Sequence, residues 1–347
     1  MAYTTIKKPS DYFNTVLYTG NGSTNNITGV GFQPDFTWIK SRTEGYGHSL
    51  FDAVRGVTKA IASEGTGAEY TFSTGLTAFG SDGFTLGSGT VVNNNSQNHA
   101  SWNWKANGAG SANTDGSISS TVSANTTSGF SIVSYTGTGS AGTVGHGLGS
   151  TPKMIIIKNI TQVTDWVVGH QEADTSNPWN KYLQLNDPTV PLDSPVFNDT
   201  APTNSVFSVG ADGKTSSGAG SHIAYCFADV QGYSKFGSYT GNGNADGTFV
   251  YTGFKPAWVM MKNTSNATSS NWLILDNKRD TYNVADSHLD ADNSDAESSA
   301  SWVNTDFLSN GFKLRTSDET INESTNTFIY MAFAEQPLVG DNPATAR

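Results

Sequence analysis

Four short sequence marks recur three times, in the same order, along this 347-residue chain, and this repeat limits its fold more than any other feature. The first mark is YTGNG or YTGTG, at Tyr18–Gly22, Tyr135–Gly139 and Tyr239–Gly243. The second is a proline followed six residues later by a lysine: Pro34/Lys40, Pro152/Lys158 and Pro256/Lys262. The third is a turn with glycine second: Asp82-Gly83, Asp212-Gly213 and Asn310-Gly311. The fourth is an aromatic-rich segment: Ala100–Ala106, Ile223–Asp229 and Ile329–Glu335. We therefore expect three diverged copies of one unit of about 105 residues.

Each mark has a simple interpretation as β-structure. Asn-Gly and Asp-Gly supply the positive φ angles of two-residue hairpin turns. The prolines precede the apolar runs FTWI, MIII and WVMM, which predict short, buried strands. In the last segment of the first unit, Trp102 and Trp104 are two residues apart and share one face of a strand. We expect them in the core, and a role in stacking on a ligand is the alternative.

The composition favours an all-β chain. Charged residues make up only 14% of the sequence, too few to cover the outer faces of long helices, and 37 residues are glycine. The segment Ser49–Ile61 has apolar spacing that would also suit a helix, but its counterpart Trp272–Asp280 is a strand followed by a turn. We therefore predict a strand over Leu50–Val54. The pairs Asp52/Arg55 and Asp276/Arg279 then predict local ion pairs, not a repeated active site.

The repeat sets the expected domain boundaries. Unit 1 spans residues 16–107, unit 2 spans 129–231 and unit 3 spans 232–337. Outside these units we expect a leader over residues 1–15, a Gly/Ser/Thr/Asn-rich linker over 108–128 and an exposed tail over 338–347.

Charge and cysteine content exclude several classes of protein. The net charge is −11 and Lys and Arg do not cluster, so we expect neither nucleic-acid binding nor attraction to an anionic membrane. Apolar runs are too short to span a bilayer, and the first residues lack the apolar stretch of a secretory signal. Cys226 is the single cysteine, so no intrachain disulfide can form.

No catalytic constellation stands out. Cys226 lies between aromatic residues in a predicted strand, where an inert thiol is expected, and the six histidines lack metal-ligand spacing. We expect no enzyme activity, no catalytic residue and no cofactor. The one metal-like run is a weak calcium candidate formed by Asp290, Asp292, Asp295 and Glu297. It lacks the spacing of an EF-hand, and a solvated acidic loop is the alternative.

A binding surface for glycans or receptors would need aromatic side chains outside the core. Four aromatic residues lie outside the repeated marks: Trp179, Tyr182, Tyr282 and Trp302. They are the candidates for surface binding, and ordinary packing is the alternative for each.

Several segments together resemble structural proteins of tailed bacteriophages, especially marine phages, described as tail-fibre-like or virion-associated. The segments are MAYTTIKKPSDYFNTVLYTGNG, GVGFQPDFTWIK, SLFDAVRG, SDGFTLGSG and ASWNWKANG. The resemblance is strong over unit 1 and good over unit 3. Unit 2 departs from it, since GLGSTPK replaces GFQPD and LFDAVRG has no counterpart.

This resemblance implies tandem β-sandwiches of the concanavalin-like or SPRY-like kind, related to jelly rolls. It also implies a virion structural protein, a surface fibre, appendage or capsid decoration, assembled in the bacterial cytoplasm and contributing to host attachment. The alternatives are a glycan-binding adhesin or lectin and a polysaccharide depolymerase. The expected partners are other virion proteins, further copies of the chain, with a trimer favoured, and host surface glycans. We expect residues 1–15, with Lys7-Lys8-Pro9, to attach the protein to the virion, and their deletion to leave the units folded.

Overall fold

The computed structural model of the chain describes residues 3–266, 271–339 and 343–345. Antiparallel strands dominate and pair into sheets that face one another, which confirms the predicted all-β sandwich fold. Within the described ranges, no helix has the length and hydrophobicity that crossing a bilayer requires. The helices are single turns: η1 (Pro9–Asp11), α1 (Thr90–Asn93), η2 (Pro178–Asn180), η3 (Pro195–Phe197), α2 (Gly213–Ser216), η4 (Ser301–Val303) and α3 (Glu319–Asn322).

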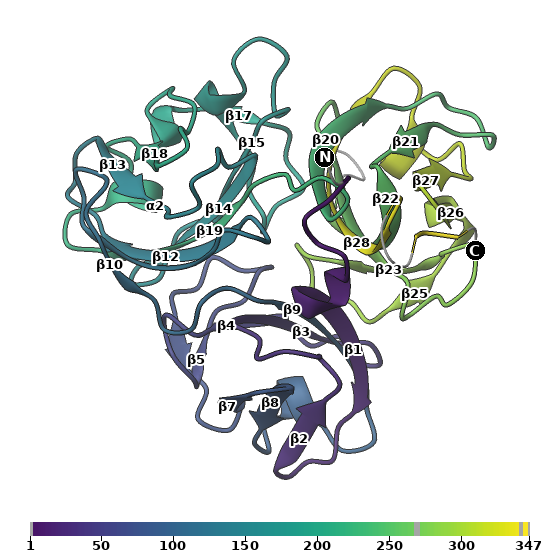
Figure 1. Ribbon diagram of the computed structural model, residues 1–347, viewed down its shortest axis with the longest axis horizontal. Coiled ribbons are helices and arrows are strands. Elements are labelled where there is room, and N and C mark those ends of the chain that lie inside the picture. Colours follow the sequence, from purple (N-terminus) through teal and green to yellow (C-terminus); the bar gives the residue numbers. More distant parts are fainter. Residues whose placement is uncertain (1–2, 267–270, 340–342, 346–347) are drawn as a thin grey trace.

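The strands form three lobes around a common centre (Figure 1). Lobe 1 has a large sheet of order β1-β9-β3-β4 and a small sheet of order β2-β8-β7, with β5 and β6 paired beside them. Its strands are β1 (Phe13–Thr19), β2 (Asn25–Thr28), β3 (Phe36–Ser41), β4 (Ser49–Asp52), β5 (Lys59–Ala60), β6 (Tyr70–Thr71), β7 (Leu76–Gly80), β8 (Gly83–Leu86) and β9 (Asn98–Trp104). The segment that could have been a helix thus begins with strand β4, as predicted.

Lobe 2 has a large sheet of order β10-β11-β12-β19-β14-β15 and a small sheet of β13 and β18, with β16 and β17 paired separately. Its strands are β10 (Ser111–Asn113), β11 (Ser120–Asn125), β12 (Phe130–Thr136), β13 (Gly142–Gly145), β14 (Met154–Asn159), β15 (Val167–His170), β16 (Lys181–Tyr182), β17 (Leu192–Asp193), β18 (Val206–Val209) and β19 (Ser221–Phe227).

Lobe 3 has a large sheet of order β20-β28-β22-β23-β24-β25 and a small sheet of order β21-β27-β26. Its strands are β20 (Ser234–Thr240), β21 (Phe249–Tyr251), β22 (Phe254–Asn263), β23 (Leu273–Asp276), β24 (Ser287–Asp290), β25 (Ser298–Ser299), β26 (Thr305–Leu308), β27 (Gly311–Leu314) and β28 (Thr327–Pro337). The four-strand order β1-β9-β3-β4 of lobe 1 therefore recurs as β12-β19-β14-β15 and β20-β28-β22-β23.

The YTG marks join the two sheets of each lobe and do not form the two-residue hairpins that we predicted. In lobe 1, β1 pairs with β9 whereas β2 pairs with β8, so the loop between them crosses from the large sheet to the small one. The tyrosine hydroxyl donates to a carbonyl of the following one-turn helix: Tyr18 to Val92 (2.6 Å), Tyr135 to Thr215 (2.7 Å) and Tyr239 to Ile321 (2.8 Å). The first glycine has no room for a side chain, because a Cβ on Gly20 would lie 2.1 Å from the carbonyl oxygen of Asn94.

The third mark has two different structures. Asp82-Gly83 and Asn310-Gly311 connect the hairpins β7–β8 and β26–β27, as predicted. Asp212-Gly213 instead begins helix α2, where the Asp212 carboxylate accepts a hydrogen bond from the amide of Lys214 (2.7 Å). Asp is a good residue for both positions, because its short side chain caps helices as well as turns.

Each large sheet is buried on both faces. One face packs on the small sheet of its own lobe, and the other face packs on the large sheets of the neighbouring lobes in a single central core. This arrangement explains why β3 and β14 are buried along their whole lengths and read as continuous apolar runs. Trp104 contacts Phe227 of lobe 2 and Trp258 of lobe 3, with ring centroids 6.5 and 5.8 Å apart.

The repeated lysines join the lobes. Each is buried and donates a hydrogen bond from Nζ to a backbone carbonyl of another lobe: Lys40 to Ser294 (3.1 Å), Lys158 to Thr66 (3.0 Å) and Lys262 to Pro188 (2.7 Å). Lobe 1 thus contacts lobe 3, lobe 2 contacts lobe 1, and lobe 3 contacts lobe 2. Burial lowers the pKa of each lysine to about 8, although nearby carboxylates oppose the shift.

A second set of contacts links the lobes in a ring. Each contact is made by the last residue of the corresponding strand, β4, β15 or β23. Asp52 accepts from the hydroxyl of Tyr225 (2.8 Å), His170 Nε2 lies 3.3 Å from the carbonyl oxygen of Tyr330, and Asp276 accepts from Trp102 Nε1 (3.1 Å). These bonds run from lobe 1 to 2, from 2 to 3 and from 3 to 1. Head-to-tail contacts of this kind close into a ring when the rotation between units fits, as it does here for three lobes.

The segments outside the predicted units are part of the folded body. Residues 108–128 are not a separate linker, because β10 and β11 extend the large sheet of lobe 2. The leader is also packed, since Ile6 and Phe13 are buried in the central core and the Tyr3 hydroxyl donates to the carbonyl of Gly253 (2.6 Å). We therefore correct the expectation that residues 1–15 can be deleted without affecting the fold. The predicted tail lies partly outside the described residues.

Candidate functional site

The four aromatic residues predicted to lie on the surface differ in their exposure in the structure. Trp179 and Tyr182 are each only 5% exposed and belong to the core of lobe 2, so their proposed role in surface binding is wrong. Tyr282 is 79% exposed but lines none of the grooves described below. Trp302 is half-buried and lines a surface groove in lobe 3. Trp302 is therefore the predicted residue that best suits a binding site.

Three segments of lobe 3 build the groove at Trp302, which has a volume of about 340 Å³ and is lined by Asn271, Trp302, Asp318, Glu319 and Thr320. Trp302 is on η4, and its ring meets the His288 ring edge-on with centroids 4.6 Å apart. Asn271 lies just before β23. Asp318 begins helix α3, where its carboxylate accepts from the amide of Thr320 (2.9 Å).

The groove combines an aromatic ring with acidic and amide groups. Two carboxylates, Asp318 and Glu319, lie on one side, and the Asn271 side-chain amide donates to Asp290 (3.1 Å). Burial lowers the pKa of His288, so the ring behind Trp302 is neutral near pH 7, although Asp290 opposes the shift. The groove is therefore polar and acidic, with one flat apolar surface.

The calcium candidates do not form a site. Glu297 pairs with Arg42 (2.7 Å) and Arg279 (3.3 Å), and this joins lobes 1 and 3. Asp290 accepts from the side-chain amides of Asn271 and Asn293, and Asp292 accepts from the amide of Trp272. Among the residues that the structure describes, no three His, Cys, Asp or Glu side chains are grouped to hold a metal ion. Asp295 is exposed.

Asp292 carries a testable consequence of this packing. Burial, with a further contribution from Asp290, raises the pKa of Asp292 to about 7, against about 4 in an unfolded chain. Because the folded chain holds this proton more tightly than the unfolded chain does, protonated Asp292 stabilises the fold. This contribution is complete below pH 4 and is lost as the pH rises through 7. Asp292→Asn should therefore raise the free energy of unfolding at pH 8 by about 1–3 kcal/mol, measured by urea titration. The matched control Asp295→Asn should change it by less than about 0.5 kcal/mol, and an equal effect of both variants would contradict the assignment.

A second groove was not anticipated from the sequence. It has a volume of about 440 Å³ and lies between the N-terminal segment, the connection from lobe 2 to lobe 3, and β21. Tyr251 is 55% exposed at its edge, and Asp229 and Lys235 form an ion pair in its wall (3.0 Å). The alternation in Phe249–Tyr251 places Val250 inside and both aromatic rings outside. This period-two alternation is the sequence feature from which the exposed rings of Phe249 and Tyr251 could have been predicted.

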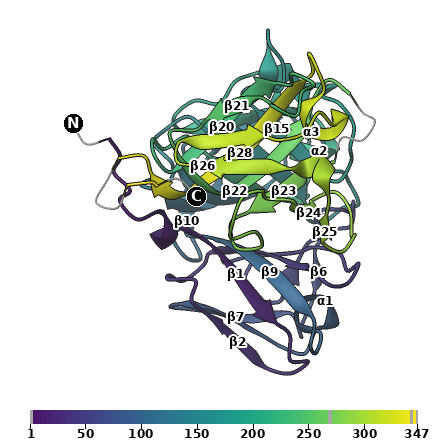
Figure 2. The same cartoon turned by 90° about the vertical axis from the view of Figure 1, so that its right-hand side faces the viewer.

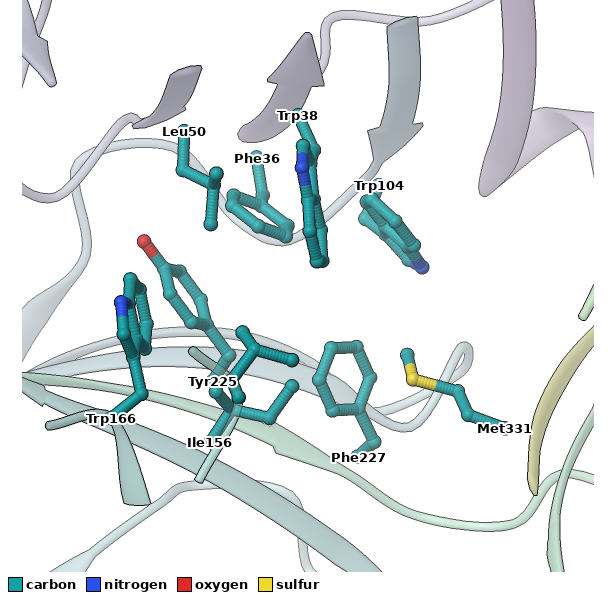
Figure 3. Close-up of a pocket in the computed structure, with 10 residues that line it drawn as sticks. Phe36, Trp38, Leu50, Trp104, Ile156, Trp166, Tyr225, Phe227 and Met331 are labelled. Atoms are coloured by element: carbon teal, nitrogen blue, oxygen red, sulfur yellow. The ribbon is translucent and has the colours of Figure 1, made fainter. Parts of the chain in front are cut away.

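The centre of the ring is closed to ligands. A residual cavity of about 10 Å³ lies there, between Phe36 and Trp104 of lobe 1, Tyr225 and Phe227 of lobe 2, and Met331 of lobe 3 (Figure 3). It has about the volume of one water molecule, and its lining is apolar, so it should stay dry. The grooves that could admit a ligand therefore lie at the periphery.

The fold and its grooves define an all-β protein of three sandwich lobes, closed into a ring, with grooves on its outside. The sequence matches the family DUF7483, a domain of unknown function, over residues 8–337, and the chain therefore belongs to that family. A comparison with curated proteins finds no match.

Proposed function

We propose that this protein is a structural component of a bacteriophage virion surface, a fibre, appendage or capsid decoration that contributes to host attachment. The sequence resemblance to tailed-phage structural proteins supports the role. The supporting observation in the structure is the closed ring, in which the three repeated lysines and the strand-end residues Asp52, His170 and Asp276 bond to neighbouring lobes. Because these bonds lie inside the ring, the outer loops are left to carry recognition.

The two ends of the ring suit different tasks. Figure 2 shows the N-terminal segment on the left and the helices α1, α2 and α3 on the right. The grooves lined by Lys7, Lys8 and Pro337 and by Tyr3 and Tyr251 border the N-terminal segment, whereas the Trp302 groove borders the start of α3. We place virion attachment at the N-terminal side and host recognition at the side of the helices.

Self-association, with a trimer favoured, remains part of the proposal. The contacts that join sandwich lobes are already used within one chain, so a trimer of chains needs other surfaces. The groove lined by Lys7, Lys8 and Glu335 is one such surface. Light scattering at micromolar concentration distinguishes a monomer from a trimer.

Electron microscopy of purified particles tests the function. A copy with a C-terminal affinity tag, labelled with gold, should appear at a fixed place on intact virions, either on the head or along the tail. A tag that stays in the lysate and never sediments with particles would contradict the proposal. An untagged virion preparation is the control for nonspecific gold.

A further inference from the structure

We propose that the groove at Trp302 binds a neutral saccharide, with one sugar ring stacked on the indole. This inference deepens the proposed role in host attachment and rests on it. The groove joins three features that sugar recognition uses: a half-buried Trp, side chains that accept hydrogen bonds, and a concave wall.

The Trp302 ring supplies the apolar part of the site. It is held in place from behind, because the His288 ring packs against it edge-on at 4.6 Å and residues of the lobe 3 core contact it. A ring that is already immobilised loses little conformational entropy when a ligand binds. An aromatic side chain that is part apolar and part polar suits a ligand with an apolar face and polar edges, as a sugar ring has.

The groove walls supply the polar part. Asp318 and Glu319 present carboxylates, which accept strong hydrogen bonds from hydroxyl groups, and Thr320 adds a hydroxyl. Asp318 is fixed by its cap contact with the amide of Thr320, so one of its oxygens is anchored. The comparable helix of lobe 2, α2, is also capped by an aspartate, Asp212, but it has Gly213 where α3 has Glu319. The neighbouring η3 places Phe197 in the core, so this combination of groups belongs to lobe 3.

Charge selects the class of saccharide. Two carboxylates beside the ring repel uronic acids and sulfated sugars, whereas neutral hydroxyl groups meet no such penalty. Behind the groove, Asp290 is 8% exposed and its Oδ1 has no hydrogen-bond partner, while its Oδ2 accepts from Asn271. Burial raises the pKa of Asp290, so the repulsion of anions comes from Asp318 and Glu319, which line the groove.

The size of the groove indicates a short ligand. A volume of about 340 Å³ is at the low end of small-molecule sites, so one or two sugar rings fit. Binding by one copy should be weak, and many copies on a particle would raise the avidity.

Glycan binding by the purified full-length protein tests the inference. The probes are immobilised neutral hexose and N-acetylhexosamine oligosaccharides, with uronic-acid oligosaccharides of equal length beside them. We expect binding to neutral probes that exceeds binding to uronic-acid probes. Trp302→Ala should weaken it about tenfold, the effect of losing a stacked ring, and Trp302→Phe should retain part of it.

Two further variants separate binding from folding. Tyr282→Ala removes an aromatic ring that is 79% exposed and lines no described groove, and it should leave binding unchanged. Glu319→Lys changes an exposed side chain, should fold normally, and should shift preference toward the uronic-acid probes.

The inference is overturned if no neutral probe binds at millimolar concentration, or if Trp302→Ala and Glu319→Lys bind like the native protein. Neither result would contradict the virion role, because the gold-labelling experiment locates the protein on the particle and does not depend on sugar binding. Failure of that labelling with intact sugar binding would instead overturn the virion role alone.

Discussion

Asp276→Ala should lower the free energy of unfolding by about 3–5 kcal/mol, because it leaves a buried guanidinium without its main partner. The Asp276 and Arg279 side chains are both 0% exposed. Asp276 accepts from Trp102 Nε1 of lobe 1 (3.1 Å) and from the backbone amides of Lys278 and Arg279. Burial opposes ionisation of Asp276, but the Arg279 guanidinium outweighs it and holds its pKa below the usual value. Urea unfolding at pH 7 measures the loss.

The matched control is the surface pair of Lys181 and Asp193. Its atoms are 2.9 Å apart, but the Asp193 side chain is 68% exposed, so Asp193→Ala should cost less than about 1 kcal/mol. A double-mutant cycle of Trp102→Phe with Asp276→Asn isolates the bond between lobes, and we expect a coupling of about 1 kcal/mol. A loss below about 1 kcal/mol for Asp276→Ala would show that neither its pair with Arg279 nor its bond to Trp102 of lobe 1 stabilises the fold as we expect.

Acidification from pH 7 to pH 5 should cost about 3–4 kcal/mol of stability through His48 and His170 together. His48 Nδ1 accepts from Trp38 Nε1 (2.7 Å), and His170 Nδ1 accepts from the amide of Glu172 (3.1 Å). A proton on Nδ1 would face those N–H donors and break both bonds. Burial accordingly lowers the pKa of His48 to about 3 and that of His170 to about 4.

The direction of the pH effect on stability follows from the lowered pKa values of the two histidines. An unfolded chain takes up the proton near pH 6.5, and the folded chain does so only near pH 3 or 4, so stability is lost as the pH falls between them. Asp292 changes stability in the opposite direction over part of this range, so the measurement is made in the Asp292→Asn variant. His48→Gln with His170→Gln should remove about 3–4 kcal/mol of the pH dependence. Part of the slope should remain, because burial also lowers the pKa of His99 and of His222 to about 4. An unchanged slope in that double variant would exclude these two histidines as the cause.

The candidate site could be predicted only in part. Trp302 stood out as an aromatic residue outside the repeated marks, and Trp179 stood out for the same reason, yet the second is buried beside Phe197. Their exposure differs because η2 and η3 pack against each other in lobe 2, a contact between segments that are distant in the chain. Asp318 and Glu319 could not be assigned to the groove, since nothing local to them indicates Asn271 or Trp302 as neighbours.

The central strands of each lobe could be predicted from the sequence alone, because proline followed by an apolar run and period-two aromatic residues encode β-structure locally. The sequence also determined that the lysines and the Asp/Arg pairs recur, but not what they do. The closure of three sandwiches into one ring could not be predicted from the sequence. The bonds of Lys40, Asp52 and Asp276 cross between lobes, and such partners are set by packing of distant segments. Residues 108–128 were predicted to be a linker but contain strands β10 and β11. They pair with the edge of the lobe 2 sheet, and the composition of the segment does not reveal that this edge is available.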